Sequence, residues 1–146
     1  MRSSLLLRAL LLLAPLVLAH RAAAQTISVS GSPSALRITT AAAGSPPTAV
    51  SNSATTYSVT NVLLPRKITA KLNSDMPVGV TLTITLAAPP GATSLGAVTL
   101  TTTAQDVVQN IGLGTFSNLA ITYQLSATTA AGVVASASKT VTLTVQ

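Results

Sequence analysis

The sequence predicts an all-β protein in which two antiparallel sheets, with about eight strands in total, pack as a two-layer β-sandwich. Short segments that alternate apolar residues with Thr or Ser recur along most of the chain. Such alternation is typical of strands with one buried and one solvated face. Gly- and Pro-rich turns separate these segments, and no long helical pattern lies between them. The apolar fraction of 48% argues against disorder, although only 7% of the residues are charged.

Residues 1–24 are predicted to be a signal peptide. Arg2 and Arg8 give a positively charged start, and Ala9–Ala19 forms an apolar run. This run is shorter than the roughly 20 residues that a membrane-spanning helix needs. A retained amphipathic anchor is the alternative interpretation of the same segment.

Cleavage is expected after Ala24, because Ala22 and Ala24 are small residues of the kind that signal peptidases accept at positions −3 and −1. Gln25 would then begin the mature protein, and residues 25–146 would form one β-sandwich domain. We therefore expect a secreted, periplasmic or cell-surface protein that has no membrane span after cleavage.

Four strands are predicted in the first part of this domain: Thr26–Ser30, Leu36–Thr40, Thr55–Asn61 and Arg66–Asn73. Their inward residues should be Ile27 and Val29, Leu36 and Ile38, Tyr57 and Val59, and Ile68, Ala70 and Leu72. Glycine and proline mark the connections at 31–33 and 41–47. Pro65 ends the third strand, since proline cannot donate to a sheet ladder.

The segment Val78–Pro89 contains the clearest strand of the chain. Its apolar face is formed by Val80, Leu82, Ile84 and Leu86. Its opposite, hydroxyl-bearing face is formed by Thr81, Thr83 and Thr85. A strand of this kind buries one face and keeps the other wet without using charge.

Three strands are predicted after the central one: Ala97–Thr102, Leu119–Ala127 and Ser138–Val145. Their inward residues should be Val98 and Leu100, then Leu119, Ile121, Tyr123 and Leu125, then Val141, Leu143 and Val145. Between the first two strands, Thr103 and Asp106 have the spacing of a helix-capping box. A short helical turn is therefore expected over Val107–Asn110.

The composition of residues 25–146 argues against catalysis. This part of the sequence has no His, Cys, Glu or Trp, and its only acids are Asp75 and Asp106. A Ser–His nucleophile and a Cys/His zinc site are therefore excluded, and a single carboxylate would make a weak calcium site. We expect no enzymatic activity, no cofactor and no bound metal, and turn formation or helix capping explains both acids.

The basic residues offer one candidate site. Five basic and two acidic residues give 25–146 a net charge of +3, half of the +6 of the whole sequence. Arg66, Lys67 and Lys71 form the only cluster, and no aromatic residues accompany it for stacking on nucleic acid. The cluster is either a small anion patch, for acidic glycans or a membrane surface, or an edge strand whose lysines discourage aggregation.

The threonines offer a second candidate site. Thr81, Thr83 and Thr85 would form a flat hydroxyl array with Thr140, Thr142 and Thr144 if their strands are neighbours. An array of this kind can bind ice or glycans, or carry O-linked sugars. The simpler interpretation is that β-branched threonine suits a pleated surface and keeps it polar.

Together these features resemble small secreted bacterial proteins of immunoglobulin-like or fimbrial-subunit type. The resemblance rests on the export signal, the cysteine-free Thr-, Ala- and Val-rich domain and the alternating closing strand Lys139–Val145. It implies an immunoglobulin-like sandwich with a structural or adhesive role, whose partners are other copies of the protein or cell-surface components.

Two further functional hypotheses stand beside this one. The first is a fimbria-like subunit that polymerises by strand addition, with Thr26–Ser30 at the start of the donor strand. The second is a ligand-binding module that uses the threonine face for ice or glycans.

Overall fold

The computed structural model describes residues 25–42 and 44–146, so the predicted signal peptide, with Ala22 and Ala24, lies outside the described residues. The described residues are all-β, with nine strands and one short 3₁₀ turn. The strands are β1 (Thr26–Ser30), β2 (Val50–Val62), β3 (Arg66–Leu72), β4 (Val80–Leu86), β5 (Thr93–Ser94), β6 (Val98–Thr99), β7 (Gln105–Ile111), β8 (Gly114–Ala127) and β9 (Val141–Val145). The turn η1 (Thr129–Ala131) lies between β8 and β9.

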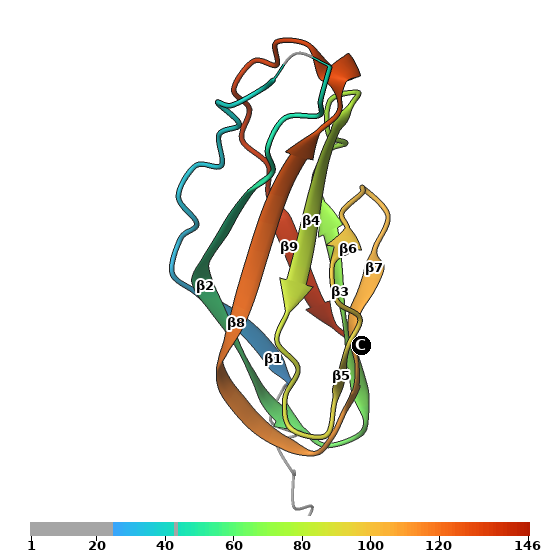
Figure 1. Cartoon of the computed structure of the whole chain (residues 1–146). Coiled ribbons are helices and arrows are strands. Elements are labelled where there is room, and N and C mark those ends of the chain that lie inside the picture. The colour runs from blue at the N-terminus through green and yellow to red at the C-terminus, as the bar shows by residue number, and fades with distance from the viewer. Residues whose placement is uncertain (1–24, 43) are drawn as a thin grey trace, which may run out of the picture.

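The strands form two antiparallel sheets, as the alternation predicts. The five-stranded sheet has the order β1-β2-β8-β4-β6, and the four-stranded sheet has the order β5-β7-β3-β9. In Figure 1, β8 and β4 of the first sheet pass in front of β9 of the second. The layers share one apolar core, so the arrangement is sandwich-like.

The core is built from the residues that alternate inward on the long strands. Of the four inward residues predicted for the central strand, Leu82, Ile84 and Leu86 of β4 are buried and Val80 is half-buried. The facing sheet contributes Ile68, Ala70 and Leu72 from β3, also as expected. Burying each large apolar side chain contributes about 1.5–3 kcal/mol to folding.

Three asparagines bend the strands where they approach one end of the sandwich. Asn61, Asn110 and Asn118 have positive φ values of 57°, 57° and 56°, a conformation that asparagine tolerates better than most residues. Val62 pairs with Gly114, and Arg66 pairs with Ile111. The β2–β3 and β7–β8 turns therefore cross between the two sheets side by side, at the lower end in Figure 1.

The predicted strand over Leu36–Thr40 is wrong. The segment has no regular secondary structure and belongs to no sheet, although Leu36 packs against the core. Gly31 follows β1 with a φ of 82°. Glycine suits this position, because a Cβ there would lie 2.7 Å from the carbonyl oxygen of Ala54. Alternation alone therefore does not make a strand, since Leu36–Thr40 pairs with no strand of either sheet.

The predicted helical turn over Val107–Asn110 is also wrong, because these residues belong to β7. Val107 and Val108 are both buried, and β7 forms ladders with β3 and β5. Asp106 uses its carboxylate for side-chain contacts with Lys67 and Gln109. Tertiary pairing has overridden the local capping signal.

The strand predicted over Ala97–Thr102 is shorter than expected. Only Val98–Thr99 pairs with β4. The chain then changes sheets, since the Leu100 amide donates to Leu82 of β4 while the Thr101 carbonyl accepts from Leu72 of β3. Two consecutive residues, Leu100 and Thr101, thus link the two layers.

Candidate functional site

Charge is segregated between the two sheets. The five-stranded sheet contains no Lys, Arg, Asp or Glu in any of its strands. The charged residues that lie on strands all belong to the other sheet and are Arg66, Lys67, Lys71 and Asp106. The outer face of the five-stranded sheet is therefore an uncharged surface across its whole width.

Hydroxyl and amide side chains cover this outer face. Thr99 of β6, Thr83 of β4, Gln124 of β8 and Ser51 of β2 form one row that crosses four strands. Neighbouring rows pair Thr81 with Ser126, Thr85 with Thr122, Ser30 with Thr56, and Thr26 with Thr60. We call this surface the hydroxyl face.

The hydroxyl face has regular spacing. Neighbouring strands lie about 4.7–4.9 Å apart, and every second residue along a strand faces the same side. Thr26 and Thr60 join their hydroxyls at 2.7 Å at one margin of the face. Such an array can donate and accept hydrogen bonds together without the desolvation cost of an ion.

The expected array of six threonines is wrong. Thr81, Thr83 and Thr85 share the hydroxyl face, but β9 lies in the four-stranded sheet beside β3. Thr142 and Thr144 therefore belong to the other layer, opposite Lys71 and Thr69. Instead, β8 supplies the neighbours of the β4 threonines, and Ser126, Gln124 and Thr122 were not singled out from the sequence.

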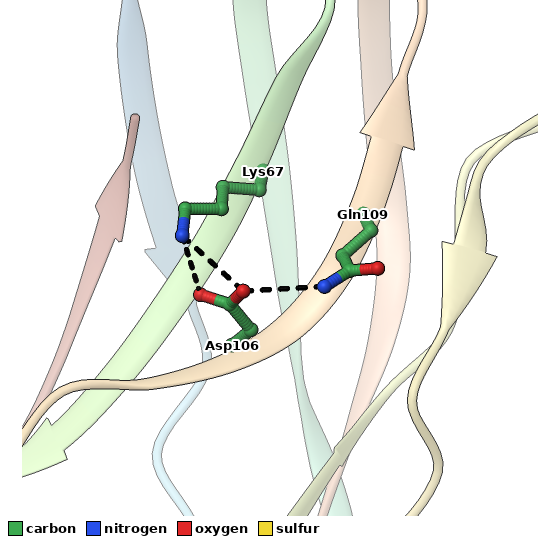
Figure 2. A network of polar contacts seen from close by, with 3 residues as sticks. All are labelled: Lys67, Asp106 and Gln109. Carbon is green, nitrogen blue, oxygen red and sulfur yellow. Dashed lines mark hydrogen bonds and ion pairs between the residues drawn. The ribbon is translucent and has the colours of Figure 1, made fainter.

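The predicted basic cluster is divided by the structure. Lys67 of β3 lies 2.9 Å from one Asp106 carboxylate oxygen and 3.2 Å from the other. Gln109 donates to the same carboxylate at 3.2 Å, as Figure 2 shows. These hydrogen bonds, that from Lys67 first, hold the pKa of Asp106 below its usual value.

Arg66 and Lys71 do not join this network. Lys71 is exposed and pairs across the ladder with Thr142. Arg66 lies beside a shallow pocket of about 420 Å³, whose lining residues are Pro65, Arg66, Lys67, Gln109, Asn110 and Gln146. The Arg66 Nε is shut off from solvent and has no hydrogen-bond partner. Gln109 and Asn110 are sequence neighbours on β7, and Gln146 reaches the pocket through its backbone pairing with Lys67.

A larger groove of about 1320 Å³ opens at the other end of the sandwich. Residues of two long connecting segments, within 33–42, 45–47 and 128–141, line it together with Leu82, Tyr123 and Leu125. The groove marks the place where the two connections cover the core without joining either sheet.

The described residues offer little for acid–base or metal chemistry. Burial raises the pKa of Tyr57 to about 12 and also raises that of Tyr123, so both phenols stay protonated at neutral pH. Among residues 25–42 and 44–146, no group of three His, Cys, Asp or Glu side chains could hold a metal ion.

No protein-family model, curated protein or solved structure matches this chain. In the part of the chain that the structure describes, no helix is long and apolar enough to cross a membrane. The functional argument therefore rests on the geometry of the hydroxyl face and of the charged sheet behind it.

Proposed function

We propose that this chain is an exported, non-catalytic immunoglobulin-like β-sandwich that serves as a structural or adhesive component of the bacterial cell surface or extracellular space. Export follows from the predicted signal peptide over residues 1–24. The observation that carries the adhesive role is the hydroxyl face, a charge-free surface that spans β1, β2, β8, β4 and β6.

The chemistry of this face favours a neutral, hydroxyl-rich ligand. Thr83, Gln124 and Ser51 offer donors and acceptors at regular intervals. Neutral glycan chains and the surface of ice present the matching pattern of donors and acceptors. The face has no aromatic platform for a single sugar ring, so we propose that it contacts an extended surface through many weak bonds.

The experiment compares one substitution at the centre of the hydroxyl face with the same substitution on the other sheet. Thr83→Arg places a long charged side chain in the middle row, whereas Thr142→Arg places it on β9. Binding of the purified protein to immobilised neutral glycans and to ice is then measured. Thr83→Arg should weaken binding about tenfold or more, because a charge must be desolvated at the contact.

The Thr142→Arg variant should bind as the unmodified protein does. Equal losses in both variants, or no binding to either surface by the unmodified protein, would overturn the proposed hydroxyl-face contact. Reproducible hydrolytic activity that a point substitution abolishes would overturn the non-catalytic assignment.

A second candidate function is that of a fimbria-like subunit that polymerises by strand addition. The outer strands β1 and β9 are its support, since neither carries a charge or a proline and neither ladder contains a bulge. Edges without such protection can accept another strand. In a polymer, β1 of one copy would take the place beside β2 of the next.

Light scattering with circular dichroism separates the two candidates. A folded β-rich monomer favours the stand-alone adhesive domain, and polymers favour strand addition. Deletion of Thr26–Ser30 should then abolish the polymers yet leave a domain that a chaperone can hold. A deletion that merely destabilises a monomer would exclude strand addition through this segment.

A further inference from the structure

We propose that the end of the sandwich formed by the β2–β3 and β7–β8 turns docks on an anionic lipid surface. Three exposed leucines, Leu63, Leu64 and Leu113, would enter the acyl boundary, and Arg66 would meet a lipid phosphate. We call the three leucines the leucine tip. This inference concerns different residues from the hydroxyl face and does not depend on its ligand.

The leucine tip is exposed in the folded protein. Leu63, Leu64 and Leu113 are 64%, 60% and 68% exposed. Turns usually carry Gly, Pro, Asn, Asp or Ser, so leucines at these positions are not explained by turn formation. They add nothing to the core, and a group of exposed apolar side chains marks a contact surface.

The pairing of the strands brings these leucines together. Val62 pairs with Gly114, and the next residues outward along the two strands are Leu63 and Leu113. Leu64 follows in the same turn. Both turns lie at the lower end of the molecule in Figure 1, so the three leucines lie at the same end of the sandwich, and none of them lines either of the two pockets described above.

A cation lies directly beside the tip. Arg66 follows the β2–β3 turn and borders the shallow pocket of the charged sheet. Both acids of the described chain are already in use, since Asp106 contacts Lys67 and Asp75 accepts from Thr102. Within the described residues, Arg66 therefore has no side-chain carboxylate partner.

The pocket beside Arg66 suits a phosphate. Lys67, Gln109, Asn110 and Gln146 line it together with Arg66. Lys67 and Gln109 already bond to Asp106, so the Arg66 guanidinium and the side-chain amides of Asn110 and Gln146 are the groups left to donate to phosphate oxygens. A lipid is favoured over a protein partner because exposed apolar side chains and a cation without an ion pair lie at the same end of the sandwich. Acyl chains and anionic headgroups are the matching partners at a membrane surface.

The test uses the absence of cysteine from the sequence, which allows one introduced thiol to be labelled alone. Leu113→Cys carries an environment-sensitive fluorophore at the tip. Val133→Cys carries it at a fully exposed apolar position, 105% exposed, at the opposite end of β8. The full chain is mixed with phosphatidylcholine vesicles, with and without phosphatidylglycerol.

The label at position 113 should shift to the blue with the anionic vesicles, while the label at position 133 should not. Leu63→Ser and Leu64→Ser should each weaken the binding about tenfold, and the exposed-valine control Val78→Ser should leave it unchanged. Arg66→Gln should remove the preference for phosphatidylglycerol. Circular dichroism of each variant checks that the fold is retained.

Three results would overturn the proposal. One is the absence of a shift at position 113, and another is an equal shift at positions 113 and 133, which would indicate adsorption without orientation. The third is a shift without vesicles that grows with protein concentration, which would assign the tip to a second copy of the chain. Thr83→Arg should not affect vesicle binding. Vesicle binding by the leucine tip and ligand binding by the hydroxyl face can therefore succeed or fail separately.

Discussion

The hydroxyl of Tyr57 donates a 2.6 Å hydrogen bond to the backbone carbonyl of Ala87. Tyr57 lies on β2, and Ala87 follows the end of β4. The bond therefore spans β8, which lies between these two strands in the sheet. It satisfies a phenol on a residue that is 0% exposed.

We predict that Tyr57→Phe lowers the free energy of unfolding by about 0.5–1.5 kcal/mol. The variant keeps the ring in the core but removes the hydrogen bond and leaves the Ala87 carbonyl without this donor. Urea unfolding at neutral pH measures the change. An unchanged midpoint would show that the bond contributes nothing to stability.

Stability should fall at alkaline pH. Burial raises the pKa of Tyr57 to about 12 and also raises that of Tyr123, so above about pH 10 the unfolded chain loses protons that the folded chain keeps. The contribution of the two protonated phenols to the free energy of unfolding is fully present below about pH 10. It declines as the pH rises towards 12. The slope is at most about 1.4 kcal/mol per pH unit for each tyrosine.

Unfolding curves between pH 8 and about pH 12 measure this slope. Tyr57→Phe should lose its share of the decline and keep the part that Tyr123 contributes. A variant with the same slope as the unmodified protein would contradict the assignment to Tyr57.

The Lys67–Asp106 contact should affect the acid range. Lys67→Met removes the hydrogen bond that most lowers the pKa of Asp106, so the pKa should rise towards its ordinary value of about 3.9. The accompanying loss of stability should stay below about 1 kcal/mol, since both side chains are partly exposed. Carboxylate NMR titration measures the pKa.

The contribution of the Lys67–Asp106 contact to stability depends on pH in the acid range. A lowered pKa stabilises the folded chain above about pH 4, and that contribution disappears as the pH falls through the lowered pKa. The difference between the two proteins should therefore vanish in acid. Lys71→Met is the matched control on the same strand and should leave the Asp106 titration unchanged.

Asn110 provides a test of the strand bends. Its φ of 57° is strained for a β-branched residue, so Asn110→Val should cost about 1–2 kcal/mol. Asn110→Gly should cost at most a few tenths of that, since glycine adopts positive φ freely. Thermal unfolding of the two variants compares them, and equal losses would mean that the side chain, rather than φ, matters at this position.

Much of the fold was predictable from the sequence because long alternating strands encode both their existence and their inward face. β1 begins and ends as expected, and Tyr57, Ile68 and Ile84 are buried as their parity requires. Alternation, however, does not specify a partner. Leu36–Thr40 has the same pattern and remains unpaired.

The sheet membership of the threonines could not be predicted for the same reason. Thr81, Thr83 and Thr142 have equivalent local patterns, and only the long-range ladders place the last of them in the other layer. The position of the β4 threonines on an outer face followed from parity, whereas their role in binding stays a prediction. The leucine tip left one signal in the sequence, namely apolar residues at turn positions beside Pro65 and Gly112.

The separation of charge between the sheets also bears on proteolysis. Trypsin-like enzymes cut after Lys or Arg, and neither residue occurs from Leu72 to Ser138. That stretch contains every strand from β4 to β8. An unfolded copy would be cut after Lys71 and Lys139 and would release this stretch as one uncut fragment. The separation of charge therefore confines cleavage by this class of protease to the residues that flank it.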